Sequence, residues 1–141
     1  MSKKALKDIP LQEITLRKYE RPVNLEKREL IRRFLLSVGL LQPGESRDII
    51  VDIFALLFEN REQGLEPDKI LKILNNRRGA SAPNIRRQVR RLRELKLVEK
   101  VFGKYKICDS VLSVVENFIE PFIIKQSTER LKEYAEQLDK K

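Results

Sequence analysis

The sequence predicts a mainly α-helical protein with one small β-hairpin. Apolar residues recur at helical spacing in several segments, which Gly, Pro and Asn separate from one another. Two short β-prone runs in the second half of the chain meet at a glycine, the usual signal of a hairpin. A chain of 141 residues fits one compact domain with appended arms. We expect an N-terminal arm and helix (1–44), a central domain (45–107) and a C-terminal helical arm (108–141).

The first helix follows a segment in which Ile14 and Leu16 alternate with polar residues. This segment is either a short strand or an extended arm, and Pro22 ends it. Asn24 is a suitable N-cap for the helix in LEKRELIRRFLLSVG, whose apolar residues recur at helical spacing. Gly39 is expected to close this helix.

The next helix, over residues 46–60, is predicted to lie at the centre of the core. Ser46 is placed to cap it, and the run RDIIVDIFALLFEN puts apolar side chains around most of its circumference. A shorter helix over residues 67–74 follows Gly64 and has Pro67 in its first turn.

A strongly basic helix is predicted over residues 81–96, after the turn NNRRGA. Ser81 is its expected N-cap. At about 100° per residue, Ile85, Val89 and Leu92 lie within about 60° of one another and form the core stripe. The arginines occupy the outward half of the helix, where solvation alone would also place them.

The whole net charge of +9 belongs to residues 77–106, which we call the basic segment. It holds eleven Lys and Arg against two Glu, while the rest of the chain has equal numbers of basic and acidic residues. The like charges of Arg86 and Arg90, and of Arg87 and Arg91, repel and destabilise the helix by roughly a few tenths of a kcal/mol per pair. This concentration is typical of a surface that meets a polyanion, and we favour that interpretation over a merely solvated helix.

The run VEKVFGKYKI predicts a hairpin over residues 98–107. We expect its strands to be joined tightly around Gly103-Lys104, which places Lys104 at the tip.

In this order of elements, residues 46–107 resemble the winged-helix family, in which a helix-turn-helix is followed by a β-hairpin wing. The resemblance rests on PDKIL, SAPNIRRQVRRLREL and ELKLVEKVFGKYKI, and it covers somewhat under half of the chain. The whole sequence is also similar to small archaeal transcriptional regulators with helical extensions. The resemblance implies a winged helix-turn-helix with N-terminal and C-terminal helical extensions. It also implies sequence-specific binding of double-stranded DNA, in transcriptional regulation.

If the basic helix enters the major groove, its N-terminal residues reach base edges first. We expect Asn84 to pair with adenine, Arg87 with guanine, and Ala82 to touch a thymine methyl group. The candidate base readers are Ser81, Ala82, Asn84 and Arg87. The candidate backbone contacts are Arg77, Arg78, Arg86, Arg90, Arg91, Lys100, Lys104 and Lys106.

The C-terminal segment is expected to be helical, with Pro121 kinking or dividing it. Its apolar stripe either folds back on the domain or pairs with a second copy, and the resemblance favours a homodimer. The candidate dimerisation residues are Val111, Leu112, Val115, Phe118, Ile119, Phe122, Leu131, Tyr134 and Leu138.

The residues that most enzyme sites require are scarce in this chain. It has no His and a single cysteine, Cys108, which excludes His-based triads and, within one chain, a disulfide or a Cys-based zinc site. Asp48 and Asp52 lie at i, i+4, and we expect them to favour the helix dipole and make local ion pairs rather than bind a metal. We therefore expect no enzymatic activity and no cofactor.

Two alternatives to DNA binding stay open. A basic helix and hairpin can also bind structured RNA, and the domain can serve as a protein-interaction subunit of a transcription or replication assembly. No small-molecule effector is named by the sequence. The chain has no apolar run long enough for a membrane span and no signal-peptide pattern at its start, so we expect a cytoplasmic protein.

Overall fold

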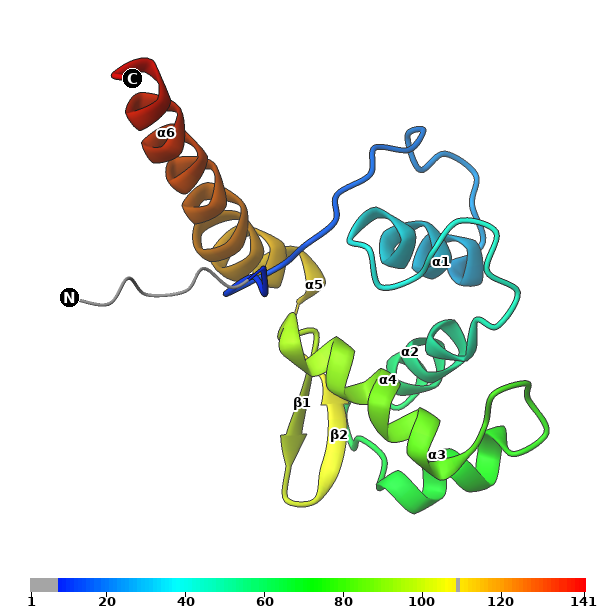
Figure 1. The fold of residues 1–141 in the computed structure, drawn as a ribbon. Helices are drawn as coiled ribbons and strands as arrows, with labels where there is room; N and C mark the ends of the chain where they lie inside the picture. The colour runs from blue at the N-terminus through cyan, green and yellow to red at the C-terminus, as the bar shows by residue number, and fades with distance from the viewer. Residues whose placement is uncertain (1–7, 109) are drawn as a thin grey trace.

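The computed structural model describes residues 8–108 and 110–141; residues 1–7 of the expected N-terminal arm and Asp109 lie outside the described part. The fold is mainly helical with one two-stranded antiparallel hairpin, which confirms that part of the prediction (Figure 1). The elements are α1 (Lys27–Ser37), α2 (Ile49–Glu59), α3 (Pro67–Leu74), α4 (Ala82–Glu94), β1 (Val98–Val101), β2 (Lys104–Ile107), α5 (Val111–Val114), the π-helix η1 (Val115–Ile124) and α6 (Lys125–Asp139).

The centre of the core is α2, as its apolar circumference predicts. It contacts α1, α3, α4 and β2. Its buried residues are Ile49, Ile50, Val51, Ile53, Phe54 and Leu57. A helix that is apolar nearly all round is stable only when neighbours cover it on several sides, and these four elements do so.

The start of α1 differs from the prediction. The N-cap is Glu26, and Asn24 lies two residues earlier with a left-handed backbone (φ 57°). The Asn24 cap was therefore wrong, because Asn also tolerates left-handed geometry and here serves the turn instead. At the other end, Gly39 (φ 80°) closes the helix as predicted, and the N–H of Leu40 donates to the carbonyl of Leu35 at 2.9 Å.

The segment before α1 is an extended arm rather than a strand. Residues 13–22 make no strand pairing, and the arm crosses the end of α1 (Figure 1). The backbone N–H of Arg17 donates to the carbonyl of Ser37 at 2.9 Å, and its guanidinium donates to the carbonyl of Leu36 at 2.9 Å. Arg17 therefore caps carbonyl groups that the end of a helix leaves without partners.

The predicted cap of α2 was also wrong. The N-cap is Asp48 rather than Ser46, and its side chain makes no capping hydrogen bond. The carboxylate of Asp48 instead lies 3.2 Å from Arg28 and 3.0 Å from Arg32 of α1, and Asp52 lies 2.5 Å from Arg28. These ion pairs join two helices and are not the local pairs that the sequence predicts.

The hairpin has its turn one residue earlier than expected. Val101 pairs with Lys104, so Phe102 and Gly103 form the two-residue turn, and both have positive φ (49° and 78°). A tight hairpin turn of this kind needs positive φ at both central positions; Gly103 adopts it without steric cost, and Phe102 adopts it against its usual preference. Lys104 therefore begins β2 instead of occupying the tip.

The C-terminal segment runs as α5, η1 and α6, and α6 projects away from the rest of the molecule (Figure 1). Pro121 does not divide the helix; it lies within the π-helical η1. Ile119 and Ile123 are buried against the body, while every residue from 125 to 141 is exposed. Within the described part of the chain, no helix has the length and apolar character of a membrane span.

Candidate nucleic-acid interface

The local sequence fixes how α4 is presented. The Ser81 hydroxyl accepts a hydrogen bond from the N–H of Asn84 at 3.2 Å, which confirms the predicted cap. Ile85, Val89 and Leu92 are 3%, 1% and 0% exposed, which confirms the core stripe. The stripe fixes the rotation of the helix and leaves the arginine-bearing half directed outward.

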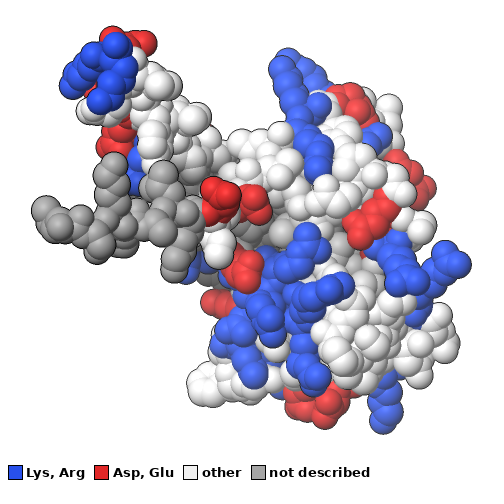
Figure 2. All heavy atoms as spheres, viewed as in Figure 1, with Lys and Arg blue, Asp and Glu red and all other residues white. Residues whose placement is uncertain are grey.

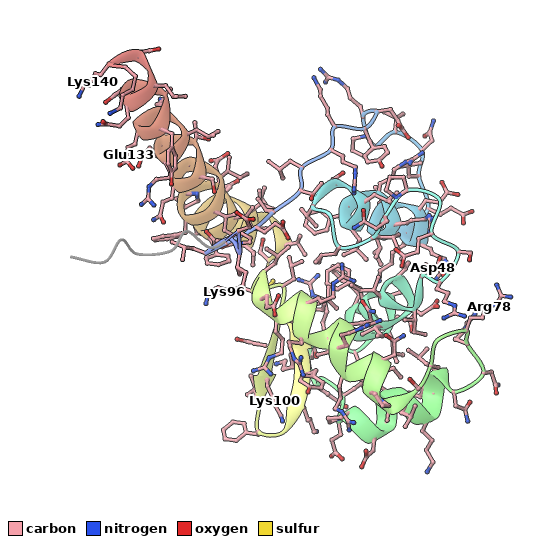
Figure 3. The ribbon with its side chains drawn as sticks, viewed as in Figure 1. Asp48, Arg78, Lys96, Lys100, Glu133 and Lys140 are labelled. Atoms are coloured by element: carbon pink, nitrogen blue, oxygen red, sulfur yellow. The ribbon has the colours of Figure 1, made fainter. Side chains whose placement is uncertain are left out.

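Lys and Arg side chains gather over α4 and the hairpin (Figure 2). Arg77 and Arg78 are exposed in the turn before α4, and Arg86, Arg87 and Arg90 are exposed on it. In Figure 3, Arg78 lies beyond one end of α4 and Lys100 on the hairpin beside the other. The basic segment thus places cations on the turn, the helix and the hairpin.

These cations lack carboxylate partners. Among residues 8–108 and 110–141, no ion pair includes a residue of the basic segment. By contrast, Arg28, Arg32 and Arg33 of α1 all lie within 4 Å of a carboxylate. The same residue type is therefore neutralised on α1 and left with its charge uncompensated on α4.

A chain of hydrogen bonds runs from the turn into the middle of α4. Asn84 Nδ2 donates to the carbonyl of Gly79 at 2.8 Å, and Asn84 Oδ1 accepts from Arg87 Nη2 at 3.0 Å and from Gln88 Nε2 at 3.2 Å. Arg91 Nη1 then donates to Gln88 Oε1 at 2.8 Å. Two guanidinium groups are thereby held in position by neutral amides.

Gln88 is the residue that the sequence interpretation missed. It is 8% exposed and is the one buried polar side chain of the described residues. Its spacing carried a signal, since it lies four residues after Asn84 and three before Arg91, where helical side chains meet.

The predicted base readers differ in how many of their hydrogen-bonding groups are left for DNA. The amide of Asn84 has internal partners at both its oxygen and its nitrogen, so pairing with adenine would compete with those bonds. The Ser81 hydroxyl accepts the capping bond, and Ala82 is half-buried. Arg87 is exposed and uses one of its five N–H donors on Asn84.

The candidate backbone contacts also fall into groups. No hydrogen bond or ion pair engages the side chains of Arg86 and Arg90 within the described ranges, whereas Arg91 is half-buried and bonded to Gln88. The Lys100 ammonium lies 5.6 Å from the centre of the Tyr105 ring, and the Arg93 guanidinium lies 5.9 Å from it. Lys104 and Lys106 are half-buried on β2.

Two hollows lie beside α4. The first, of about 390 Å³, is lined by Glu45, Arg47, Ile49, Gly79, Ser81, Pro83, Asn84, Arg87 and Gln88. The second, of about 460 Å³, lies between the N-terminal arm, the end of α4 and η1; its polar walls include Arg91 and Glu94. The second hollow is where the C-terminal segment meets the domain.

The C-terminal candidates for dimerisation divide into two sets. Ile119 is buried within its own chain, and Val111, Val115 and Phe118 are half-buried against the core. The exposed members are Leu112, Phe122, Leu131, Tyr134 and Leu138. Apart from Leu112, the members up to Ile119 thus fold back on the domain, while those from Phe122 onward stay uncovered.

In the described ranges, no group of three or more Cys, Asp or Glu is placed to hold a metal ion. Burial raises the pKa of the Cys108 thiol above its usual value, and the thiol donates to the carbonyl of Ser110 at 3.5 Å. No protein-family model matches this chain, and the searches of curated proteins and of solved structures find no significant match.

Proposed function

We propose that this protein is a winged-helix regulator that binds double-stranded DNA sequence-specifically. The helix-turn-helix is α3 and α4, which contact each other, and the wing is the hairpin β1–β2. The observation that carries the proposal is the contrast between the paired arginines of α1 and the unpaired cations of the basic segment. Phosphates are the ligands that such a surface gains most from meeting.

In this proposal α4 lies in the major groove, whose width of about 12 Å admits one helix. Arg87 reads a guanine edge, because its guanidinium is exposed, near the start of the helix, and oriented by Asn84. Arg86 and Arg90 contact phosphates, since no hydrogen bond or ion pair from the described residues engages their side chains. Asn84 acts mainly by positioning Arg87 and the preceding turn.

We also propose that the protein acts as a homodimer through α6. α6 continues η1 beyond the body of the protein, and every residue of α6 is exposed, so its turns receive no tertiary packing. Leu131, Tyr134 and Leu138 recur at i, i+3 and i+7, so they form one apolar stripe along that helix. Pairing with the same stripe of a second copy would cover both.

Fluorescence anisotropy with labelled duplex DNA at low and moderate salt tests the proposal. We expect binding that weakens by orders of magnitude, about 10³-fold or more for six or more phosphate contacts, between 50 and 200 mM salt. Arg86→Ala/Arg90→Ala should weaken binding strongly. Lys18→Ala/Lys132→Ala removes the same charge from exposed positions outside the basic segment and should leave binding nearly unchanged.

Competition with duplex RNA and with single strands separates the nucleic-acid classes. If the protein prefers duplex RNA to duplex DNA, its partner is structured RNA and the proposed DNA binding is wrong. If the wild-type protein binds no nucleic acid at low salt, the proposal fails and the protein-interaction function becomes the better one.

A further inference from the structure

The tip of the hairpin carries a fully exposed aromatic side chain. Phe102 is 100% exposed, the highest value among the large apolar residues of the described chain. It holds the first position of the two-residue turn with φ 49°, where Asn or Gly is the favoured residue. Phe102 is therefore unfavourable both for the turn and for solvation, so neither explains its presence.

The surroundings of Phe102 are cationic rather than apolar. Lys100 precedes it on β1, and Lys104 and Lys106 follow on β2; the hairpin's one carboxylate, Glu99, is paired in register with Lys106 at the other end. No other large apolar residue of the hairpin is exposed, among those the structure describes. A protein-docking surface requires a contiguous apolar patch, and a single ring among lysines does not provide one.

The second aromatic residue of the hairpin shows what ordinary packing looks like here. Tyr105 is buried, bridges to Leu65 through two backbone hydrogen bonds and carries Lys100 and Arg93 over its ring. Phe102 has none of these contacts. Next to it, Gly103 has no side chain and an added Cβ there would meet no atom within 4 Å, so Phe102 supplies the side chain of the two-residue turn and is not crowded by its neighbour.

We propose that Phe102 is an apolar wedge that enters the minor groove and partly unstacks one base step, while Lys100 and Lys104 contact the flanking phosphates. This inference rests on the proposed DNA binding by α4, and it adds the part of the DNA that the hairpin contacts. The minor groove, about 6 Å wide, admits an inserted side chain, and apolar side chains inserted between base pairs kink the duplex. The steps that unstack most easily are TA and CA/TG, so we expect one of these beneath the tip.

The experiment compares wild type with Phe102→Asn and Phe102→Leu. The DNA is a duplex selected from a random pool by the wild-type protein, with 2-aminopurine placed at each adenine in turn. We expect wild type to raise 2-aminopurine fluorescence at one step, and Phe102→Leu to retain part of the rise. Phe102→Asn should abolish the rise and weaken binding about tenfold, in line with the loss of one aromatic–base contact.

The thermal stability of the Phe102→Asn variant shows whether Phe102 serves DNA binding or the stability of the hairpin. Because Asn-Gly is the preferred turn pair, we expect this variant to unfold at a higher temperature while it binds DNA less tightly. If Phe102→Asn binds the selected duplex as wild type does, or if wild type binds without any fluorescence rise, the wedge is wrong and DNA binding by α4 stands. If wild type binds no duplex, the proposed function fails and the wedge fails with it.

Discussion

Asn84 ties the start of α4 to the turn before it, through a hydrogen bond of 2.8 Å from its amide nitrogen to the carbonyl of Gly79. Gly79 has φ 82°, and a Cβ on it would lie 3.1 Å from that same nitrogen. A side chain at this position would strain the backbone and crowd the Asn84 amide, so the turn favours glycine. Asn84 Oδ1 accepts a hydrogen bond from Arg87, the proposed base reader. The conformation of the turn is therefore coupled to the orientation of the Arg87 side chain.

Asn84→Ala should lower the free energy of unfolding by about 1 kcal/mol and also reduce discrimination between DNA sequences, because Arg87 loses its partner. Chemical denaturation and anisotropy with matched and scrambled duplexes measure the two effects. Ser110→Ala is the control: its hydroxyl caps α5 by accepting from the N–H of Ser113 at 3.1 Å, far from Arg87 in the sequence. It should cost about 1 kcal/mol as well and leave discrimination intact.

Arg87→Ala and Arg90→Ala should have different effects on DNA binding. Arg87→Ala should lose about 1–3 kcal/mol of preference at one base pair. Arg90→Ala should weaken all sequences alike and make the slope of log K against log salt shallower by about one phosphate contact. Titrations of target and scrambled duplexes across a salt series distinguish them, and identical behaviour of the two variants would show that the assignment of reader and clamp is wrong.

Gly64 and Gly44 allow backbone strain to be separated from steric overlap. Both have positive φ (74° and 77°), but an added Cβ at Gly64 would lie 2.5 Å from the Lys106 side chain and 2.8 Å from the Tyr105 carbonyl, while at Gly44 it would meet nothing within 4 Å. Gly44→Ala should cost about 1 kcal/mol and Gly64→Ala about 3 kcal/mol. Thermal unfolding of both variants checks this, and equal losses would mean that the hairpin shifts freely.

The α6 stripe should control oligomeric state. Leu131→Lys/Leu138→Lys places two charges on the stripe and should convert a dimer to a monomer in sedimentation equilibrium. Gln126→Lys/Gln137→Lys adds the same charge outside the stripe and should leave the dimer intact. A wild-type protein that is monomeric at micromolar concentrations would contradict the proposed pairing.

The thiol of Cys108 should make stability depend on alkaline pH. Burial raises its pKa in the folded protein, so the folded chain retains this proton at a pH where the unfolded chain has lost it. The resulting stabilisation is complete below the thiol pKa of the unfolded chain and is lost as the pH rises above it. Alkylation by iodoacetamide should reach half its maximal rate at a higher pH in native protein than in urea; the same midpoint in both would contradict the effect of burial.

Periodic patterns predicted the core well, because the burial of a helix face depends on residues within that helix. The apolar circumference of α2 and the stripe of Ile85, Val89 and Leu92 both appear as expected. The caps were less predictable: Asn24 and Ser46 each compete with neighbouring polar residues, and the choice depends on how the chain enters the helix. Only Ser81, directly before a proline-initiated turn, was assigned correctly among these three.

Features that depend on contacts between distant segments could not be predicted. Nothing in the sequence indicates that Arg28 meets Asp48 and Asp52, because that pairing depends on how α1 lies against α2. For the same reason, the lack of carboxylate partners for the α4 arginines among the described residues emerges only from the fold. The turn at Phe102 and Gly103 was misplaced because phenylalanine is an improbable residue for left-handed backbone.

The detached position of α6 gives the protein an internal reporter of its own association. Backbone amides in α2 exchange hydrogen only when the whole domain opens, whereas amides in α6 need only the local opening of an uncovered helix. Deuterium uptake by α6 should therefore fall as protein concentration rises, while uptake by α2 stays constant. A single mass-spectrometric dilution series thus separates the coupling between copies from the stability of each copy, without a covalent label and without DNA.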